Sequence, residues 1–152
     1  PGGPIFITEG LLRRLKTEAE LAGVLGHEIG HVIARHSSER LAKQQLMQGL
    51  LSALVVGSGD YTTAQIGQVV GSMIHMSYGR DDELESDALG IRIMAEGGYD
   101  PRALIRVMEV LAKASGGSRQ PEFFSTHPAP ENRIARIREE IAKLQAGNFE
   151  RR

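Results

Sequence analysis

The sequence predicts a mainly α-helical domain of the α+β class, with a short edge strand or a small sheet. Several long segments open with capping residues and close with glycines, which is typical of helices. One short run, Ile5-Phe6-Ile7, is β-branched and aromatic and follows a Pro/Gly turn, which favours a strand. With 152 residues the chain can bury a substantial core. We therefore expect one domain over residues 1–152, from which upstream N-terminal residues are missing.

Two helices are predicted directly after this strand. Thr8 is placed to cap a brief helix that ends near Leu15. The run Thr17-Glu18-Ala19-Glu20 is a capping box, in which two side chains satisfy free N–H groups at a helix start. We expect the helix that follows to reach about His36. It contains three glycines, each costing about 1 kcal/mol relative to alanine, so we expect another backbone or the substrate to approach it closely. These glycines are Gly23, Gly26 and Gly30.

The rest of the chain is also expected to be helical. Asp100-Pro101 is an N-cap followed by proline at the first helical position. Gly97-Gly98 and Gly116-Gly117 are placed to stop helices, and Gly147 to cap the last one. The predicted helices cover 39–56, 63–76 (a weaker prediction), a segment from Asp81 or Asp82 to before Gly97, 101–115 and 131–146, with a loop through residue 130.

His27-Glu28-Ile29-Gly30-His31 lies inside the second predicted helix. Positions i and i+4 of a helix share one face, so both imidazoles can reach one metal ion. Glu28 is then close enough to act on a water bound to that ion. The flanking residues are mostly apolar or small, which indicates a buried helix. The pattern H-E-x-x-H is the signature of zinc peptidases.

A catalytic zinc site usually has three protein ligands and one open position. A third histidine six residues after the second is excluded, because position 37 is serine and His36 is one residue away. Glu83 and Asp87 lie four residues apart on a predicted helix and share a face, whereas Glu85 points away from Glu83. One of the two can bind zinc while the other accepts the outward N–H of a ligating histidine.

The composition excludes several other kinds of site and partner. There is no cysteine, so any metal must be held by histidine and carboxylate. The formal net charge is −1, and the basic residues near the C-terminus alternate with glutamates, so we expect no nucleic-acid partner. The longest apolar stretch, 50–56, is far below the ~20 residues that span a bilayer, so we expect no transmembrane segment in this chain.

Three segments together resemble the gluzincin peptidases related to the CAAX prenyl protease, HtpX and the BepA-like periplasmic proteases. They are His27-Glu28-Ile29-Gly30-His31-Val32 with Arg35-His36-Ser37, then Glu83-Leu84-Glu85-Ser86-Asp87-Ala88-Leu89-Gly90, then Ser125-Thr126-His127-Pro128 followed by Arg133. The family usually has alanine where Ser86 stands. Its membrane-spanning members carry hydrophobic segments that this chain lacks, so the BepA-like branch is the closer likeness. That branch implies a bacterial, periplasmic or otherwise extracytoplasmic location, and zero cysteine fits an oxidising compartment.

The resemblance implies a gluzincin-type zinc metalloendopeptidase domain that holds one Zn²⁺ per chain. Carried over residue by residue, it makes His27, His31 and Glu83 the zinc ligands. Glu28 would be the catalytic base, and Asp87 would hold a ligating histidine. In this mechanism the base takes a proton from a zinc-activated water and delivers it to the leaving amine.

The oxyanion of the reaction needs a hydrogen-bond donor besides zinc. The donors available near the motifs are His127, Tyr78, Arg80 and Arg133, and some of them could instead contact substrate. His127 has a second interpretation that resembles regulated family members, in which a His-Pro loop adds a fourth zinc ligand and closes the site. A capping or surface role is its bland alternative. For His36 and His75 we expect an ordinary surface or core role. The strand at 5–7 either pairs with extended substrate or is a plain core strand.

The leading hypothesis is therefore a zinc endopeptidase that acts on unfolded or misassembled polypeptides, membrane-associated proteins among them. A second hypothesis is a chaperone or assembly factor that uses the same groove, with zinc capped by His127. A third is a helical domain with a structural metal, which would be closed by four protein ligands.

Overall fold

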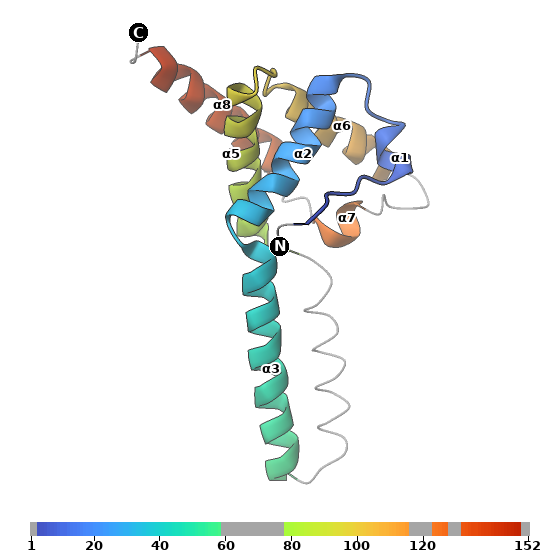
Figure 1. The fold of residues 1–152 in the computed structure, drawn as a ribbon, viewed down its shortest axis with the longest axis vertical. Helices are drawn as coiled ribbons and strands as arrows, with labels where there is room; N and C mark the ends of the chain where they lie inside the picture. Colours follow the sequence, from blue (N-terminus) through green and yellow to red (C-terminus); the bar gives the residue numbers. More distant parts are fainter. Residues whose placement is uncertain (1–2, 59–77, 116–122, 128–131, 150–152) are drawn as a thin grey trace.

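Helices form nearly all of the regular structure in the computed structural model, which describes residues 3–58, 78–115, 123–127 and 132–149 (Figure 1). They are α1 (Glu9–Leu12), α2 (Glu18–Ile33), α3 (His36–Ser58), α5 (Arg80–Glu96), α6 (Ala103–Ser115), α7 (Phe123–Thr126) and α8 (Arg133–Phe149). The predicted mainly helical fold is confirmed. The helix predicted over 63–76 lies outside the described residues. No helix in the described ranges is long and apolar enough to cross a membrane.

The strand predicted at residues 5–7 is not present. This segment is extended chain, and Thr8 directly after it has φ −70° and ψ 143°. A strand requires hydrogen bonds to a neighbouring strand. No described segment pairs with residues 5–7, so the β-branched pattern produces extended backbone without a sheet. Phe6 is consequently 84% exposed.

The predicted caps of the first two helices are present. Thr8 Oγ1 accepts a hydrogen bond from Leu11 N, and α1 ends at Leu12, earlier than predicted. Thr17 Oγ1 accepts from Glu20 N at 3.2 Å. The Glu20 carboxylate accepts from the N–H of Lys16 at 2.6 Å rather than from that of Thr17, so only the Thr17 half of the predicted capping box is present.

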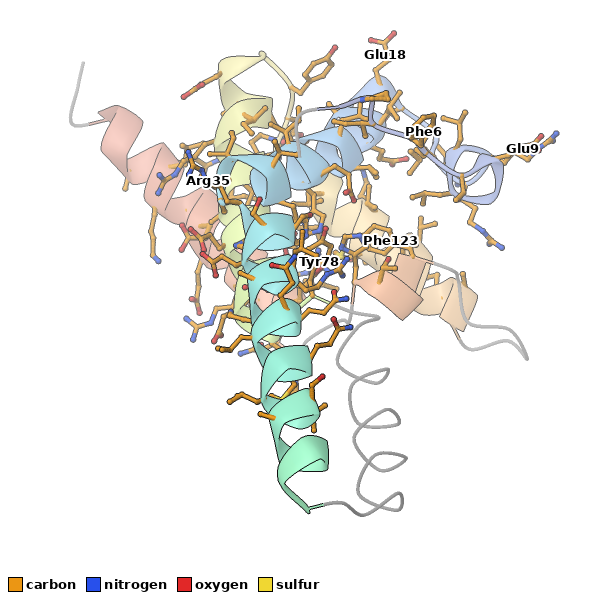
Figure 2. All side chains as sticks on the ribbon, turned by 60° about the horizontal axis from the view of Figure 1, so that its bottom comes forward. Phe6, Glu9, Glu18, Arg35, Tyr78 and Phe123 are labelled. Carbon is orange, nitrogen blue, oxygen red and sulfur yellow. The ribbon has the colours of Figure 1, made fainter. Side chains whose placement is uncertain are left out.

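The second helix is shorter than predicted. It ends at Ile33, and Arg35 adopts a left-handed φ of 61° before α3 begins at His36 (Figure 2). A non-glycine residue in this region is uncommon and cannot continue a right-handed helix. The break turns the chain, and α3 extends away from the other helices (Figure 1).

Helices α2 and α5 form the most extensive helix pair, and their backbones touch. A Cβ placed on Gly30 would lie 2.8 Å from the carbonyl oxygen of Ser86 and 2.9 Å from its Cα. A Cβ on Gly90 would lie 3.0 Å from the carbonyl carbon of Gly26. Larger residues at these positions would push the helices apart. The predicted close approach of another backbone to the α2 glycines is confirmed for Gly26 and Gly30, and α5 supplies that backbone.

The core lies where α5, α6 and α8 pack behind this crossing. Its most buried apolar side chains, each at most 1% exposed, are Ile91, Met94, Ala103, Leu104, Val107, Leu111 and Ile137. The C-terminal elements differ from the prediction at their ends. Helix α6 starts at Ala103 instead of Pro101, α8 runs through Gly147 to Phe149, and α7 forms inside the predicted loop. Helix α7 is important because it leads directly into His127.

Candidate metal centre

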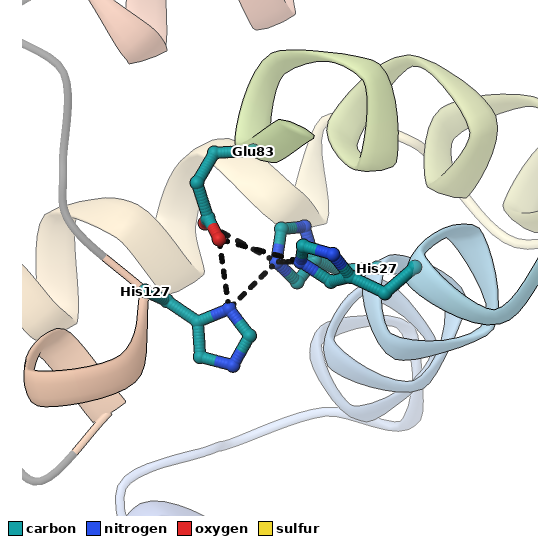
Figure 3. A group of neighbouring side chains, drawn as sticks. His27, Glu83 and His127 are labelled. Atoms are coloured by element: carbon teal, nitrogen blue, oxygen red, sulfur yellow. Dashed lines mark hydrogen bonds and ion pairs between the residues drawn. The ribbon is translucent and has the colours of Figure 1, made fainter. Parts of the chain in front are cut away.

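Four buried side chains converge where α2 crosses α5 (Figure 3). His27 and His31 come from α2, Glu83 from the first turn of α5, and His127 directly follows α7. One nitrogen or carboxylate oxygen from each lies within 4.8 Å of the others. The structure thus brings together the three residues expected as zinc ligands, with His127 beside them.

The separations of these atoms suit a small tetrahedral ion. The Nε2 atoms of His27 and His31 are 3.1 Å apart, and they lie 3.4 and 3.3 Å from the Glu83 carboxylate. His127 Nδ1 is 3.4 Å from His27 Nε2 and 3.0 Å from Glu83 Oε1. Four ligands at 2.0–2.1 Å from a tetrahedral zinc ion would be about 3.3 Å apart. The separations within the donor set therefore fit a tetrahedral ion of the size of zinc.

Glu83 is a second feature of the cluster that suits a metal cation. Its carboxylate is fully buried, and its Oε2 makes no hydrogen bond within the described part of the chain. Arg133 Nη1 lies 2.9 Å from this oxygen as an ion pair, without the alignment of a hydrogen bond. Burial opposes the charged form of Glu83, but contacts with the three clustered histidines outweigh it and hold the pKa of Glu83 far below its usual range. A buried, ionised carboxylate facing two imidazoles is a natural metal ligand.

His27 is held from behind by a charged pair. Its Nδ1 is 2.9 Å from Asp87 Oδ1, so with Nε2 toward the cluster it donates its Nδ1–H to this carboxylate. Arg133 grips the same carboxylate through Nε at 2.6 Å and Nη2 at 2.9 Å. Burial raises the pKa of Asp87, but the hydrogen bonds from Arg133 and His27 outweigh it and lower the pKa below its ordinary value. Burial likewise lowers the pKa of His27, yet hydrogen bonds to Asp87 and Glu83 leave it above 6.5.

His31 is held by His36, for which we expected only an ordinary surface or core role. His36 is 3% exposed, and its Nδ1 lies 2.9 Å from Nδ1 of His31. A neutral His31 with Nε2 toward the cluster donates from Nδ1 to His36. His36 then carries its own proton on Nε2, 3.3 Å from Glu85 Oε2, while Ser86 Oγ is 3.3 Å from its Nδ1. Burial lowers the pKa of His31 below 6.5.

The break after α2 is what allows His31 and His36 to meet. On one continuous helix, side chains five residues apart point about 140° away from each other around the axis. The left-handed turn at Arg35 removes this restriction. The signal that could have identified His36 is its distance of five residues from the motif, read together with a helix end before it.

Tyr78 covers the other face of His31. The two rings stack with centroids 3.9 Å apart, and the Tyr78 hydroxyl lies 2.8 Å from Ser37 Oγ. The Arg40 guanidinium lies 4.6 Å from the centre of the Tyr78 ring. Tyr78 also donates its backbone N–H to the carbonyl of Thr126, at the end of α7.

Glu28 lies next to the cluster but outside it. Its side chain is 27% exposed, and its Oε1 is 3.5 Å from Nε2 of His127. His127 therefore has one nitrogen toward the cluster and the other toward Glu28. A partly exposed carboxylate beside a buried metal site can contact an incoming molecule and the metal centre together.

The sequence of this chain matches that of peptidase family M48 over residues 1–141. The chain belongs to this family. Members are metallopeptidases, and the domain described here has the helical fold that the resemblance implied. The M48 match covers the two α2 histidines, Glu83 and His127.

Several relatives of this chain are named as proteases or metallopeptidases. The chain is 35% identical over 136 residues to the mitochondrial metalloendopeptidase OMA1 of Arabidopsis thaliana, covering 88% of this chain and 27% of that protein. It is 32% identical over 154 residues to the beta-barrel assembly-enhancing protease of Yersinia pestis, covering 95% and 32%. For metalloprotease YcaL of Escherichia coli the identity is 30% over 143 residues, covering 92% and 56%. The chain thus spans about a third or less of the first two relatives.

The two arginines expected near the M48 site differ in their placement. Arg133 is 2% exposed and is occupied by the carboxylates of Asp87 and Glu83. Arg80 is the exposed first residue of α5 and makes no hydrogen bond or ion pair with another described residue. His75 lies outside the described ranges.

Proposed function

We propose that this M48 domain is a zinc endopeptidase, with His27, His31 and Glu83 as the zinc ligands and Glu28 as the general base. The observation that carries the proposal is the spacing of the four clustered donors, with a partly exposed glutamate 3.5 Å from one of them. Asp87 acts behind His27 and fixes its donor nitrogen. Residues 1–152 form a single catalytic domain in this proposal.

His27, His31 and Glu83 would hold the zinc, which would supply a Lewis acid and lower the pKa of a bound water to about 7. Glu28 takes a proton from the attacking water and transfers it to the leaving amine. The donors left free to contact the oxyanion or the substrate are few. Arg133 is committed to two carboxylates, whereas Tyr78 and Arg80 are at least partly accessible.

His127 gives the site a closed resting form in this proposal. Its Nδ1 takes the fourth place around the cluster, and its Nε2 faces Glu28. For substrate to bind, His127 has to withdraw, and its Nε2–H is then available to the oxyanion. The two roles foreseen for this residue thus belong to two positions of one side chain. Activity that rises in His127→Ala supports the cap, and unchanged activity contradicts it.

We propose unfolded or misassembled polypeptides as substrates, membrane-associated proteins included, in an extracytoplasmic compartment of a bacterium. The name of the Yersinia pestis relative, a beta-barrel assembly-enhancing protease, and the absence of cysteine support this choice. Cell fractionation tests the location.

The cap also supports a second candidate function. A site closed by His127 can bind unfolded chains without cutting them, as a chaperone or assembly factor does. The discriminating observation is aggregation: such a factor keeps an unfolded protein soluble at equal molar ratio while leaving its chains intact.

The decisive experiment compares Glu28→Gln with Glu18→Gln, an exposed position on the same helix. Wild type and Glu18→Gln are expected to bind one zinc and to cleave casein, an unfolded substrate. Glu28→Gln is expected to keep the zinc and lose at least about a hundredfold in rate, the contribution typical of a general base. Equal cleavage by both variants would remove Glu28 from the mechanism. Zinc that resists chelation, with no cleavage by any form, would indicate a structural metal.

A further inference from the structure

Tyr78 connects three parts of the molecule that meet at the metal cluster. Its ring stacks on that of His31, with the centroids 3.9 Å apart and the planes inclined by 25°. Its hydroxyl lies 2.8 Å from Ser37 Oγ and its ring faces the guanidinium of Arg40, so the first two turns of α3 contact this side chain (Figure 2). Its backbone N–H donates to the carbonyl of Thr126 at 3.0 Å. The proposed mechanism counts Tyr78 only among the accessible donors and leaves these contacts without a role.

The hydrogen bond from Tyr78 holds the backbone that carries His127. The carbonyl of Thr126 belongs to the same peptide unit as the nitrogen of His127, so the bond acts directly on this unit. The N–H of His127 donates to the carbonyl of Phe123 at 2.9 Å, and the two rings stack with centroids 4.5 Å apart. The His127 imidazole is therefore fixed relative to α7 by Phe123, and relative to the metal cluster by Tyr78.

A fixed donor and a movable donor have different effects on the position of His127. If the donor is fixed, withdrawal of Thr126 and His127 breaks the bond, so the bond favours the closed position. A donor that follows its acceptor keeps the bond in both positions, and a contact that is equal in two states favours neither. The side chain of Tyr78 decides between these cases, because its stack on His31 and its contacts with α3 keep its backbone in place.

We propose that Tyr78 is a positioning residue that keeps His127 in the closed place at the metal cluster, with its ring held by His31 and the first turns of α3. The proposal rests on the part of the proposed function in which His127 closes the site. In this role Tyr78 acts through Thr126 and needs no contact with substrate. Loosening Tyr78 raises the fraction of open molecules, and the affinity for a ligand of the open form rises in proportion.

Acetohydroxamate, a small zinc-binding molecule, measures the open fraction because it needs the place that His127 takes. Calorimetry on the zinc-loaded protein gives its affinity. Tyr78→Leu removes the stack and the hydroxyl, and we expect it to bind acetohydroxamate about tenfold more tightly than wild type. Tyr99→Leu, at a 41% exposed position after α5, is the control and should bind it like wild type.

The same change in a protein without the cap shows whether Tyr78 acts through His127. In the His127→Ala background, Tyr78→Leu is expected to leave acetohydroxamate binding unchanged, because the group on which it acts is gone. Equal tightening with and without His127 overturns the proposal, as does the absence of tightening in Tyr78→Leu.

Two milder variants keep the ring on His31, in case zinc binding requires the stack. Tyr78→Phe and Ser37→Ala each remove only the contact between the two hydroxyl groups. Each is expected to tighten acetohydroxamate binding about three- to tenfold, the net effect of one hydrogen bond, and the double variant no more than either alone. Ser52→Ala, at an exposed position on the same helix, is the control. Affinities equal to that of Ser52→Ala overturn the proposal.

Casein cleavage separates failure of this role from failure of the peptidase function. A larger open fraction lowers KM for casein about tenfold in Tyr78→Leu and leaves kcat unchanged. A lower kcat at unchanged KM overturns the proposal, since it indicates damage to the site. Acetohydroxamate binding that tightens only when His127 is present, without cleavage by any form, contradicts the peptidase function and supports the role of Tyr78. Cleavage by wild type, with acetohydroxamate affinities that none of the Tyr78 and Ser37 variants changes, contradicts the role of Tyr78 and keeps the peptidase function.

Discussion

The two histidines that α2 contributes to the cluster, His27 and His31, lie one helical turn apart but have opposite surroundings. Behind His27 is a charged chain. Its Nδ1 faces Asp87, and Asp87 is gripped by Arg133, with each of these three side chains at most 3% exposed. Buried charges of this kind are stable only when all of them are paired.

Behind His31 is a chain of hydrogen bonds that ends in solvent. Its Nδ1 faces the imidazole of His36, and His36 in turn faces Glu85, whose side chain is 62% exposed. The pKa values follow this difference, since the pKa of His27 is raised and that of His31 is lowered. One histidine is therefore fixed by ion pairing in the core, and the other by a hydrogen bond near the surface.

Of the changes considered, removal of Arg133 from the charged chain behind His27 should destabilise the protein most. Arg133→Met keeps the length of the side chain but leaves Asp87 and Glu83 buried without their cation. We expect a loss of about 3–5 kcal/mol in the free energy of unfolding of the metal-free protein, the usual effect of breaking a buried pair. Urea denaturation in the presence of a chelator measures it.

The control for this variant is Arg136→Met on the same helix. Arg136 pairs with Glu139 at 3.0 Å, and both side chains are more than half exposed. Such surface pairs contribute at most about 1 kcal/mol. Equal losses in the two variants would mean that burial of the Arg133 pair has no special weight.

Asp87→Asn should weaken metal binding without removing a hydrogen-bond acceptor. The amide oxygen can still accept from His27, but the charge that favours a strongly donating ligand is lost. We expect zinc affinity to fall about 10–100-fold, as is usual for such partners of metal ligands. Competition with a chromophoric chelator measures the affinity, and Asp100→Asn at the start of α6 is the control. Unchanged affinity would contradict the role given to Asp87.

His36→Phe, which changes the partner of His31, should have a smaller effect than Asp87→Asn. The ring volume is kept, but His31 Nδ1–H loses its acceptor. We expect zinc affinity to fall about tenfold. His36→Asn, which offers an oxygen close to the position of Nδ1, should recover part of it. If both variants bind zinc like wild type, the contact between the two imidazoles has no effect on the site.

Lowering the pH should change the stability contributions of His27 and His31 in different pH ranges. This is the smallest of the expected effects. His27, whose pKa is raised, adds stability below pH 6.5 that is lost as the pH rises through its folded pKa. His31, whose pKa is lowered, adds stability above pH 6.5 that is lost as the pH falls. These contributions act on opposite sides of pH 6.5, so the melting temperature of the metal-free protein should rise as the pH falls towards 6.5 and decline below it.

Below about pH 4.5 the charged side itself is titrated. The lowered pKa values of Glu83 and Asp87 mean that their stabilisation is complete above 4.5 and 3.8 and is lost as the pH falls further. Thermal melts in chelator should show a steep loss there. In Asp87→Asn the partner that raises the pKa of His27 is weakened, so the rise in melting temperature towards pH 6.5 should be smaller than in wild type. An equal rise in both proteins would contradict the comparison.

Spacing within helices explains how much of the site could be predicted. His27 and His31, and likewise Glu83 and Asp87, are four residues apart, and helical geometry fixes their common faces before any tertiary structure is known. The choice of Glu83 over Asp87 as the ligand came from the family likeness. Which of the two carboxylates faces the histidines depends on where along their lengths α2 and α5 cross. The sequence of neither helix alone specifies that position.

Features without a periodic pattern could not be predicted. The left-handed turn at Arg35 occurs at a residue type that rarely adopts it, so the role of His36 was missed. Helix α7 has four residues, too few for a recognisable repeat. The segment at 5–7 has the composition of a strand, but the composition of a segment does not reveal whether a partner strand is present.

The contact between Gly30 and Ser86 has a consequence for how this enzyme could be redesigned. Because main-chain atoms of the two helices meet there, no side chain lies between them whose change of rotamer could alter the spacing of the two backbones that carry the imidazoles and the carboxylate. The side of the proposed metal centre that α2 and α5 form is therefore rigid. Changes of specificity therefore belong in the N-terminal segment, where new side chains can be introduced without moving α2 or α5.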